Sequence, residues 1–496
     1  MNLTKKIFTG SALQTTNIFF DIAIGFFMMP FLINGLGDKW YGLWLLIGSI
    51  MGFFGLLTIG LSGAVQRYLS IENTPEKIDD YNATLNSSVA VFSFTAVVAI
   101  ALSFVISLLP TLFITDTALS EAFSTLIILM GFNIAIAFVA SPFRAVLLTN
   151  YNFSLVSFSE LVAIVSKASL TFGLIMSGYG VVAVAVSTLI STLLCSLIFF
   201  FFALKEQKKI KFNRSYIQKH KLVLLFRYGA KTFIGWIGDI LRFSIDNMVI
   251  TAFVGLSAVT IYNIPVRLLG YASQFIVTAL GVLQPLFSQL AGKKNHEDIK
   301  RKFEFAYGIS FAMAALLSSG LFVFGYDFIS LWVGEYDEVK ELMYIIPVML
   351  LLTTSQNPCI LILYSHNKHQ YYAYQNIGEG VLNVIVSLIA VQYWGILGVA
   401  VGTLIPSLVT KLFLQPRLTC GVLSYSLTKY YKQMFSCFTF VALVSFVGMN
   451  VKGDINGWGD LVINVLLFSA AFIPSYWVIC LNKNTKHFFV SKFKRS

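Results

Sequence analysis

Four charged residues lie on one face of an otherwise apolar segment of this chain. The segment is residues 231–246, and its charges are Lys231, Asp239, Arg242 and Asp246. At about 100° per residue of an α-helix, these positions fall within an arc of roughly 80°. A charge at the centre of a bilayer costs about 2.5 to 3.5 kcal/mol. This face must therefore contact protein or water inside a membrane bundle, and function is expected there.

The types and spacing of these charges indicate ion pairing and anion binding. Arg242 stands three residues after Asp239 and four before Asp246, so both acids can pair with it on a helix. Our hypothesis is that the acids hold Arg242 and that Arg242 and Arg267 bind phosphate through their planar guanidinium groups. Two alternatives stay open: internal ion pairs that hold helices together, or acids that carry protons or Na⁺. Lys231 is another candidate for anion binding, although its ammonium could instead reach the headgroups.

Four more ionisable residues lie inside apolar segments. Glu160 and Lys167 are seven residues apart, two helical turns, so they share one face. Lys167 joins the candidates for anion binding, and Glu160 is a candidate for ion coupling or a conformational role. Asp21 and Glu379 have no basic residue within a turn or two. We expect both to act in coupling to protons or Na⁺, or in conformational change.

The composition excludes an ordinary soluble protein. Of 496 residues, 57% are hydrophobic and 12% are charged, with a mean hydropathy of +0.78, whereas soluble domains carry about 25% charged residues. The five cysteines show no metal-ligand spacing and are expected to be small core residues. No phosphate-binding loop, nucleophile elbow or zinc-protease motif occurs, so we expect neither an enzyme nor a bound cofactor or metal. An all-α polytopic membrane protein is predicted instead.

Fourteen apolar stretches are long enough to span a bilayer. The first lacks a cleavage site and is expected to be a retained helix rather than a removed signal. The predicted helices cover residues 10–35, 40–65, 84–110, 118–148, 154–177, 180–204, 223–254, 257–290, 303–333, 339–365, 371–394, 395–418, 431–451 and 457–481.

The basic residues set the orientation of these helices. Of the 35 Lys and Arg residues, 28 fall in the termini and loops of one side, 3 in those of the other and 4 within helices. The positive-inside rule then places both termini in the cytoplasm. This placement accounts for the net charge of +12 without a nucleic-acid partner. The basic segment near 205–228 is expected to touch anionic headgroups.

The two halves of the chain resemble each other at an offset of about 215 to 219 residues. Residues 184–192 match 399–407 at six of nine positions, and Gly37 aligns with Gly255. We therefore predict two six-helix lobes related by a pseudo-twofold axis along the membrane normal, with a cavity between them. The predicted division is an N-lobe (1–204), a basic cytoplasmic linker (205–222), a C-lobe (223–418), a helix pair (419–482) and a basic cytoplasmic tail (483–496).

Two segments resemble a known family. Residues 244–268, with Asp246, Gly255 and Arg267 in order, are similar to the helix 7–8 pattern of polysaccharide transporters. Residues 35–44 resemble the helix 1–2 turn of the same transporters. By this resemblance the chain is identified as a member of the multidrug/oligosaccharidyl-lipid/polysaccharide exporter superfamily, and within it of the flippases for O-antigen or capsule repeat units.

The resemblance implies a specific activity. The substrate would be an undecaprenyl-diphosphate-linked oligosaccharide, moved by alternating access from the cytoplasmic to the periplasmic leaflet of the bacterial inner membrane. Basic residues of a central cavity would bind the diphosphate, and the polyprenyl tail would stay in lipid beside the last two helices. A passive carrier and one coupled to protons or Na⁺ through the intramembrane acids both stay open. The expected partners are membrane lipids, a polysaccharide polymerase and a chain-length regulator.

Three alternative functions stay open. A drug/cation antiporter of the same superfamily would rely on carboxylates and an aromatic pocket more than on Arg242 and Arg267. A lipid II flippase is less favoured, because those proteins carry arginines in helices 1 and 2. Here helix 1 has Asp21 and no arginine, and Arg67 lies at the cytoplasmic end of helix 2. A membrane glycosyltransferase or polymerase would need a large exterior loop, which this sequence lacks.

Overall fold

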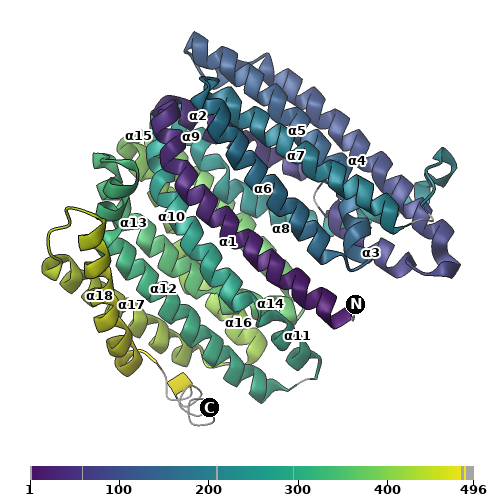
Figure 1. The fold of residues 1–496 in the computed structure, drawn as a ribbon. Helices are drawn as coiled ribbons and strands as arrows, with labels where there is room; N and C mark the ends of the chain where they lie inside the picture. Colours follow the sequence, from purple (N-terminus) through teal and green to yellow (C-terminus); the bar gives the residue numbers. More distant parts are fainter. Residues whose placement is uncertain (1–2, 59, 208–209, 294, 482–484, 487–496) are drawn as a thin grey trace. The chain divides into compact units, whose positions relative to one another are not determined.

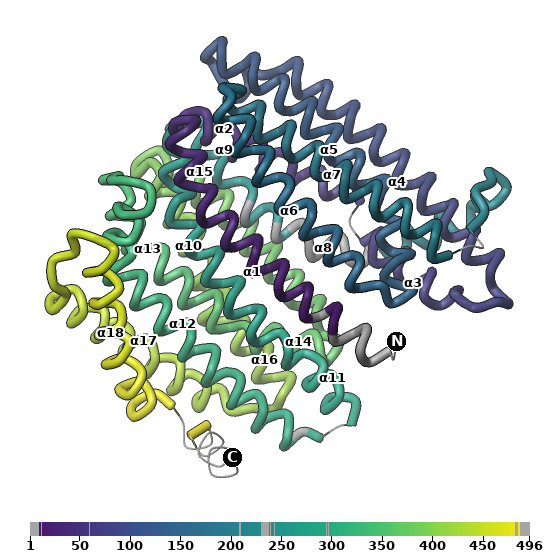
Figure 2. Tube along the Cα trace, in the orientation of Figure 1, coloured from purple at the N-terminus to yellow at the C-terminus, as the bar shows by residue number. Residues whose placement is uncertain are grey.

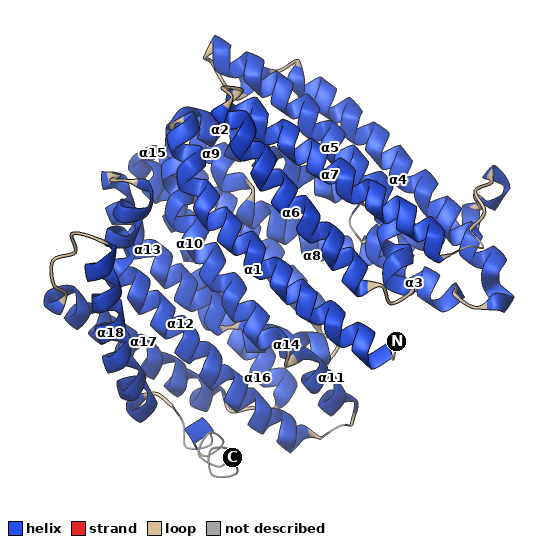
Figure 3. Ribbon diagram, viewed as in Figure 1, coloured by secondary structure: helices blue, strands red, loops and turns tan. Residues whose placement is uncertain are grey.

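The computed structural model of the chain describes residues 3–58, 60–207, 210–293, 295–481 and 485–486 (Figure 1). Within these ranges the regular structure is helical, and turns and short loops join the helices (Figure 3). Some helical residues have side chains outside the described part of the structure, and Lys231 and Asp239 are among them. The predicted contacts of these two residues therefore stay predictions.

The helix count predicted from the sequence is confirmed. Among the described residues, twelve helical stretches are long and apolar enough to cross a membrane. One of them, His369–Leu423, reverses direction at Gly395, where the backbone leaves the helical conformation, and so provides two crossings. α8 (Lys219–Phe243) and α9 (Ile245–Phe253) are not among the twelve and form the remaining crossing. The chain is therefore a multi-pass, all-α membrane protein.

The chain folds into two compact units, Met1–Ile240 and Leu241–Ser496. The division falls inside α8, so the helix with the charged face contributes to both units. The five-part division into lobes, linker, helix pair and tail stays a prediction.

The first unit is a bundle of long helices that pack side by side. α5 packs against both α4 and α7, and α6 packs against α7 and α1. Besides the first part of α8, its α-helices are α1 (Leu3–Leu36), α2 (Asp38–Phe54), α3 (Leu61–Glu72), α4 (Ile78–Ser107), α5 (Thr117–Thr149), α6 (Phe153–Met176) and α7 (Gly180–Glu206).

The basic segment after α7 is held against α4 by side-chain hydrogen bonds. Asn86 accepts a hydrogen bond from the backbone N–H of Asn213 (3.2 Å) and donates one to the carbonyl of Lys211 (2.8 Å). The hydroxyl of Tyr216 donates to Asp79 (2.9 Å), and this bond raises the pKa of Tyr216. This part of the predicted linker is thus anchored to the first unit.

The second unit contains the remaining helices (Figure 2). α12 packs along α13, α17 and α18, and α10 packs against α13. Its further elements are α10 (Leu256–Gly281), α11 (Gln284–Gly292), α12 (His296–Val333), α13 (Asp337–Ser355), α14 (Asn357–Ser365), α15 (His369–Val409), the π-helix η5 (Thr410–Leu414), α16 (Gln415–Leu423), α17 (Leu427–Val451) and α18 (Trp458–Ile479).

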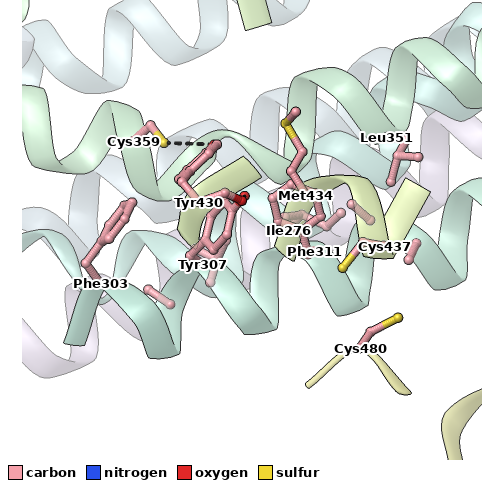
Figure 4. Close-up of a cluster of buried hydrophobic side chains, with 14 of the residues drawn as sticks. Ile276, Phe303, Tyr307, Phe311, Leu351, Cys359, Tyr430, Met434, Cys437 and Cys480 are labelled. Atoms are coloured by element: carbon pink, nitrogen blue, oxygen red, sulfur yellow. Dashed lines mark hydrogen bonds between the residues drawn. The ribbon is translucent and has the colours of Figure 1, made fainter. Parts of the chain in front are cut away.

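α12, α14 and α17 of the second unit meet around a buried aromatic cluster (Figure 4). The ring centroids of Tyr307 and Tyr430 are 4.4 Å apart, and Cys359 Sγ lies 3.5 Å from the Tyr430 hydroxyl. All five cysteines have free thiols, and four are buried, with Cys195 half-buried. The prediction that they are small core residues is confirmed for those four.

The repeat has a counterpart in the backbone. Gly37 and Gly255, which align in sequence, both have positive φ (81° and 121°), and each directly precedes a helix, α2 and α10. A side chain is strained in this conformation, which glycine adopts freely. Gly180 and Gly395 also share positive φ, at the turns before the sixth and twelfth crossings.

Candidate functional site

Glu379 lies at the centre of a buried ionic cluster in the second unit. Its side chain is 1% exposed, its Oε1 lies 3.1 Å from Arg242 Nε, and its Oε2 lies 3.2 Å from Lys411 Nζ. The hydroxyls of Ser407 and Thr410 donate to the same two oxygens at 2.9 and 2.7 Å. Buried charges persist when they are paired and hydrogen-bonded. Both oxygens of Glu379 are therefore occupied by groups of the protein itself.

The reversal at Gly395 brings these residues together. After it, Gly398 and Gly402 form a small-xxx-small pattern, which allows close approach of helix backbones. A Cβ added at Gly402 would lie 2.7 Å from the Cα of Ser387, and one at Gly398 would clash with the carbonyl of Ala390. The two halves of α15 thus pack backbone to backbone near the turn.

Further from the turn, polar residues meet across the two helices at intervals of one helical turn. Asn383 donates to Thr403 (3.1 Å), Ser407 to Glu379, and Gln375 to Gln415 (3.2 Å). We call this contact the polar seam; its members are Gln375, Glu379, Asn383 and Ser387 on one side and Thr403, Ser407, Lys411 and Gln415 on the other.

The π-helix η5 interrupts the seam at Thr410–Leu414. Because of its wider turn, the adjacent residues Thr410 and Lys411 both reach Oε2 of Glu379. Short π-helical turns within α-helices are frequent at functional sites.

Asp246 begins the seam at its other end. Its Oδ2 accepts hydrogen bonds from the hydroxyls of Tyr262 (2.9 Å) and Thr403 (3.1 Å). Its Oδ1 is buried and accepts no hydrogen bond from the described residues. Asp246 is thus a buried carboxylate with one oxygen open to a proton or a small cation.

The structure adds a partner for Arg242 that the sequence did not predict. Its observed ion pair is with Glu379 on α15, and its charge also acts on Asp246, one of the two acids expected to hold it. The hydrogen-bond partners of Asp246 come from α10 and α15. The expected pairing with Asp239 lies outside the described side chains.

In the first unit, Glu160 pairs with Arg144 of α5. Arg144 donates to Glu160 Oε1 through Nε (3.1 Å) and Nη2 (2.9 Å). Lys167 is exposed on the same helix, α6. A cavity of about 380 Å³ adjoins the pair and is lined by α5, α6 and α7.

Asp21 and Arg267 are exposed near the middle of their helices, α1 and α10. α10 runs without interruption through Pro265. No hydrogen bond or ion pair joins Arg267 to a residue that the structure describes. An exposed guanidinium at membrane depth is available to an anion.

Sequence reasoning missed two cations. Lys411 and Arg144 were counted only among the 28 basic residues of the cytoplasmic side, yet each lies within a helical crossing and pairs with a predicted acid. For Lys411 a signal existed in the four-residue spacing of Thr403, Ser407, Lys411 and Gln415, which marks one polar face on an apolar helix.

An apolar groove lies between α17 and α18 of the second unit. Its volume is about 410 Å³, and Lys452 and Asn464 are the polar residues near one end. Lys452 is paired with Asp327 (2.6 Å). The remaining lining is mainly apolar and includes Phe324, Leu443, Val447, Leu467, Phe468 and Phe472.

Comparison with known proteins gives a family and one curated relative. A family model described as a polysaccharide biosynthesis protein matches residues 8–291, more than half of the chain. The chain is also 21% identical over 505 residues to the uncharacterized membrane protein EpsK of Bacillus subtilis, a match that covers 97% of each protein.

Solved membrane transporters share the fold. An inward-facing multidrug resistance transporter of the MATE family has a TM-score of 0.69 at 16% identity, covering 84% of this chain and 99% of that chain. The lipid II flippase MurJ in an inward closed conformation has a TM-score of 0.66 at 18% identity, and the match covers 94% of this chain and 99% of MurJ. A transporter of the MOP superfamily from Pyrococcus furiosus has a TM-score of 0.61 at 15% identity, and the match covers 86% of this chain and 98% of that chain. These identities establish the fold alone. The relatives are described as transporters or a flippase, in agreement with the expectation of a non-enzymatic protein.

Proposed function

Because the chain belongs to the polysaccharide biosynthesis protein family, we propose that it is a flippase for an undecaprenyl-diphosphate-linked oligosaccharide, such as an O-antigen or capsule repeat unit. It acts in the bacterial cytoplasmic membrane by alternating access, with both termini in the cytoplasm. A polysaccharide polymerase and a chain-length regulator are its proposed partners. The observation that carries the proposal is Arg267, an exposed arginine deep in a membrane helix of a polysaccharide family member.

Arg267 is assigned to the diphosphate. It is the twelfth residue of α10, about 16 Å along a helix of 26 residues, so it lies near mid-membrane. A guanidinium there is too costly to face lipid, and its planar fork matches phosphate oxygens. Arg242 is less available, because Glu379 holds it in the ionic cluster. Lys167 is a second exposed cation of the membrane helices and is a candidate for the same anion.

The groove between α17 and α18 is assigned to the polyprenyl chain. Its lining is mainly apolar, and its volume of about 410 Å³ suits several isoprene units rather than a sugar. Burial of apolar chain stabilises the bound lipid by about 25 cal/mol per Å². The oligosaccharide would not bind in this groove, which offers it few hydrogen-bonding groups.

Coupling to a proton or Na⁺ is assigned to Asp246. Glu379 is occupied by Arg242 and Lys411, whereas Asp246 Oδ1 is buried without a hydrogen bond from the described residues. A buried carboxylate oxygen can be satisfied by a proton or a small cation. Asp21 and Glu160 keep their proposed conformational roles.

The decisive experiment measures flipping of a fluorescent undecaprenyl-diphosphate oligosaccharide in proteoliposomes. We expect Arg267→Ala to slow flipping at least tenfold and Arg267→Lys to retain part of the rate. Arg227→Ala, which removes an exposed arginine of α8, is the matched control. A normal rate with Arg267→Ala would remove the diphosphate assignment.

Drug/cation antiport is the second candidate, because the TM-score of the MATE transporter (0.69) is similar to that of MurJ (0.66). The same proteoliposomes distinguish the two. Transport of organic cations without flipping of the lipid-linked oligosaccharide would establish the antiporter.

A further inference from the structure

The polar seam continues beyond the ionic cluster into a set of neutral side chains. Gln375 donates to Gln415 (3.2 Å), Gln415 donates to the backbone carbonyl of Gln356 (3.2 Å), and Tyr430 donates to the side-chain oxygen of Gln356 (2.5 Å). All four residues are at most 6% exposed. Three amides and a phenol thus form one buried hydrogen-bonded group, which we call the glutamine cluster.

Several atoms of the glutamine cluster lack a partner. Gln375 Oε1, Gln356 Nε2 and the hydroxyl of Thr419, one turn after Gln415, are buried and make no hydrogen bond within the described structure. One is an acceptor, one a donor and one can be either. A metal ion could satisfy only the acceptors, whereas water satisfies all three. Buried polar groups of this kind are normally satisfied by ordered water.

The cluster lies between the start of α15 and the ionic cluster. Gln375 is the seventh residue of α15, and the exposed residues Asn367 and Lys368 directly precede this helix. Glu379 lies one helical turn after Gln375, and Asn383 lies two turns after it. The seam therefore runs about 12 Å from Gln375 to Asn383. Asn383 donates to Thr403, which donates to Asp246. Polar groups therefore follow one another from this end of α15 to Asp246.

Packing alone does not require these groups. Near Gly395 the two halves of α15 are held by close backbone contact at Gly398 and Gly402. Close packing alone can therefore join this helix pair. Leucine has about the volume of glutamine, and replacing both partners of a buried hydrogen bond by apolar groups can be nearly neutral for stability. The buried amides, with the π-helix beside them, point to a role other than holding the helices together.

We infer that the polar seam is a hydrated proton-transfer route from the cytoplasmic end of α15 to Asp246. This inference rests on the proposed coupling role of Asp246. A hydronium at the glutamine cluster gives up a proton and becomes water, the proton passes between waters held by amides and hydroxyls, and it forms an O–H bond at Asp246 Oδ1. When access alternates, the O–H bond breaks and the proton passes to a water on the opposite side. Among the described side chains, the charged and titratable groups that act on Asp246 are Arg242 and Tyr262, and Glu379 and Lys411 lie further along the seam. Those beside the glutamine cluster are Tyr307, Cys359 and Tyr430, and Tyr372 lies under Lys411.

The charges of the route favour reversible protonation. The four charged side chains of the route that the structure describes, Arg242, Lys411, Glu379 and Asp246, sum to zero when all are ionised. A proton on Asp246 leaves these four with one net positive charge, which disfavours permanent occupancy. Asp246 can thus be loaded and unloaded as its access changes.

The test measures proton uptake into proteoliposomes that enclose a pH-sensitive dye, with an imposed pH gradient. We expect wild-type protein to take up protons, Asp246→Asn to abolish the uptake, and the double variant Gln375→Leu/Gln415→Leu to slow it at least tenfold. Thr419→Val, a nearly isosteric change at an unpartnered hydroxyl, should slow it several-fold. Gln392→Leu is the matched control, because Gln392 is exposed on the same helix and bonds only to its own helix.

Two readouts separate the possible failures. Unfolding temperatures of all variants in detergent show whether a slow variant is simply misfolded, and Thr419→Val is expected to keep the wild-type value. Asp246-dependent uptake that the seam variants leave unchanged would overturn the route, as would an absence of uptake in wild-type protein. Flipping of the lipid-linked oligosaccharide is measured separately in the same vesicles. Its absence would reject the proposed function while the proton measurement still decides the route.

Discussion

Arg242 Nε lies 3.1 Å from Glu379 Oε1, so a buried charge pair joins the end of α8 to the first half of α15. Lys411 shares the same carboxylate. The three residues come from three segments that are far apart in sequence. Their mutual dependence leads to the first prediction.

Removing the shared anion should cost more stability than removing one cation. Glu379→Gln leaves Arg242 and Lys411 buried without their carboxylate, whereas Arg242→Met leaves Glu379 paired with Lys411. We expect Glu379→Gln to lower the free energy of unfolding by about 3 to 5 kcal/mol, the usual cost of breaking a buried pair, and Arg242→Met by less. Thermal unfolding in detergent measures both. Lys340→Met, which removes an exposed pair with Asp337, is the control and should change little.

Asp246→Asn should remove the ion dependence of transport without unfolding the protein. Asparagine keeps the size of the side chain and an oxygen that can accept hydrogen bonds from Tyr262 and Thr403. It carries no charge and does not take up a proton as a carboxylate does. We expect the flipping rate of wild-type protein to vary with pH or Na⁺ and that of Asp246→Asn to be flat. Asp337→Asn, at an exposed position, serves as control. An unchanged ion dependence in Asp246→Asn would contradict the coupling assignment.

The close contact of the two halves of α15 should not tolerate a methyl group. A Cβ at Gly402 would lie 2.7 Å from the Cα of Ser387, which is backbone and cannot move alone. Gly402→Ala is expected to destabilise the protein by about 1 to 3 kcal/mol, as overpacking does. Gly378→Ala is the matched control on the same helix, since nothing lies within 4 Å of its added Cβ. Equal unfolding temperatures for the two variants would show that the contact is looser than described.

The fold could be predicted from the sequence because its signals are local. Each apolar stretch specifies its own crossing, and Gly37 and Gly255 mark equivalent turns of the repeat. The ion pairs could not be predicted in the same way. Spacing within one helix relates Arg242 to Asp239 and Asp246 but says nothing of Glu379, which reaches Arg242 from another helix. Pairing between segments depends on packing that periodicity does not encode.

The positive-inside rule predicts the sidedness of two turns. Glu335 lies in the turn between α12 and α13, and Asn213 lies in the basic segment before α8. A cysteine at 335 should react with a membrane-impermeant maleimide in intact cells, and a cysteine at 213 only after permeabilisation. The native cysteines are buried or half-buried and give a low background. The reverse labelling pattern would invert the topology.

The anchoring of α8 to the first unit should weaken at high pH. Lys221 Nζ lies 2.7 Å from Glu72 Oε1 and 3.0 Å from Asp80 Oδ1. Burial alone would lower the pKa of Lys221, but the hydrogen bonds and charges of the two acids outweigh it and raise the pKa above its usual 10.5.

Because the folded pKa lies above the unfolded one, the stabilisation is fully present below the unfolded pKa and is lost as the pH rises through the folded pKa. The stability difference between wild-type protein and Lys221→Met should therefore stay constant from about pH 7 to about pH 9 and shrink above about pH 10.5. Unfolding temperatures across this range measure it. Lys219→Met, at an exposed position two residues earlier, should show no such pH dependence. A difference that grows with pH would mean that Lys221 is not stabilised as an ammonium by these acids.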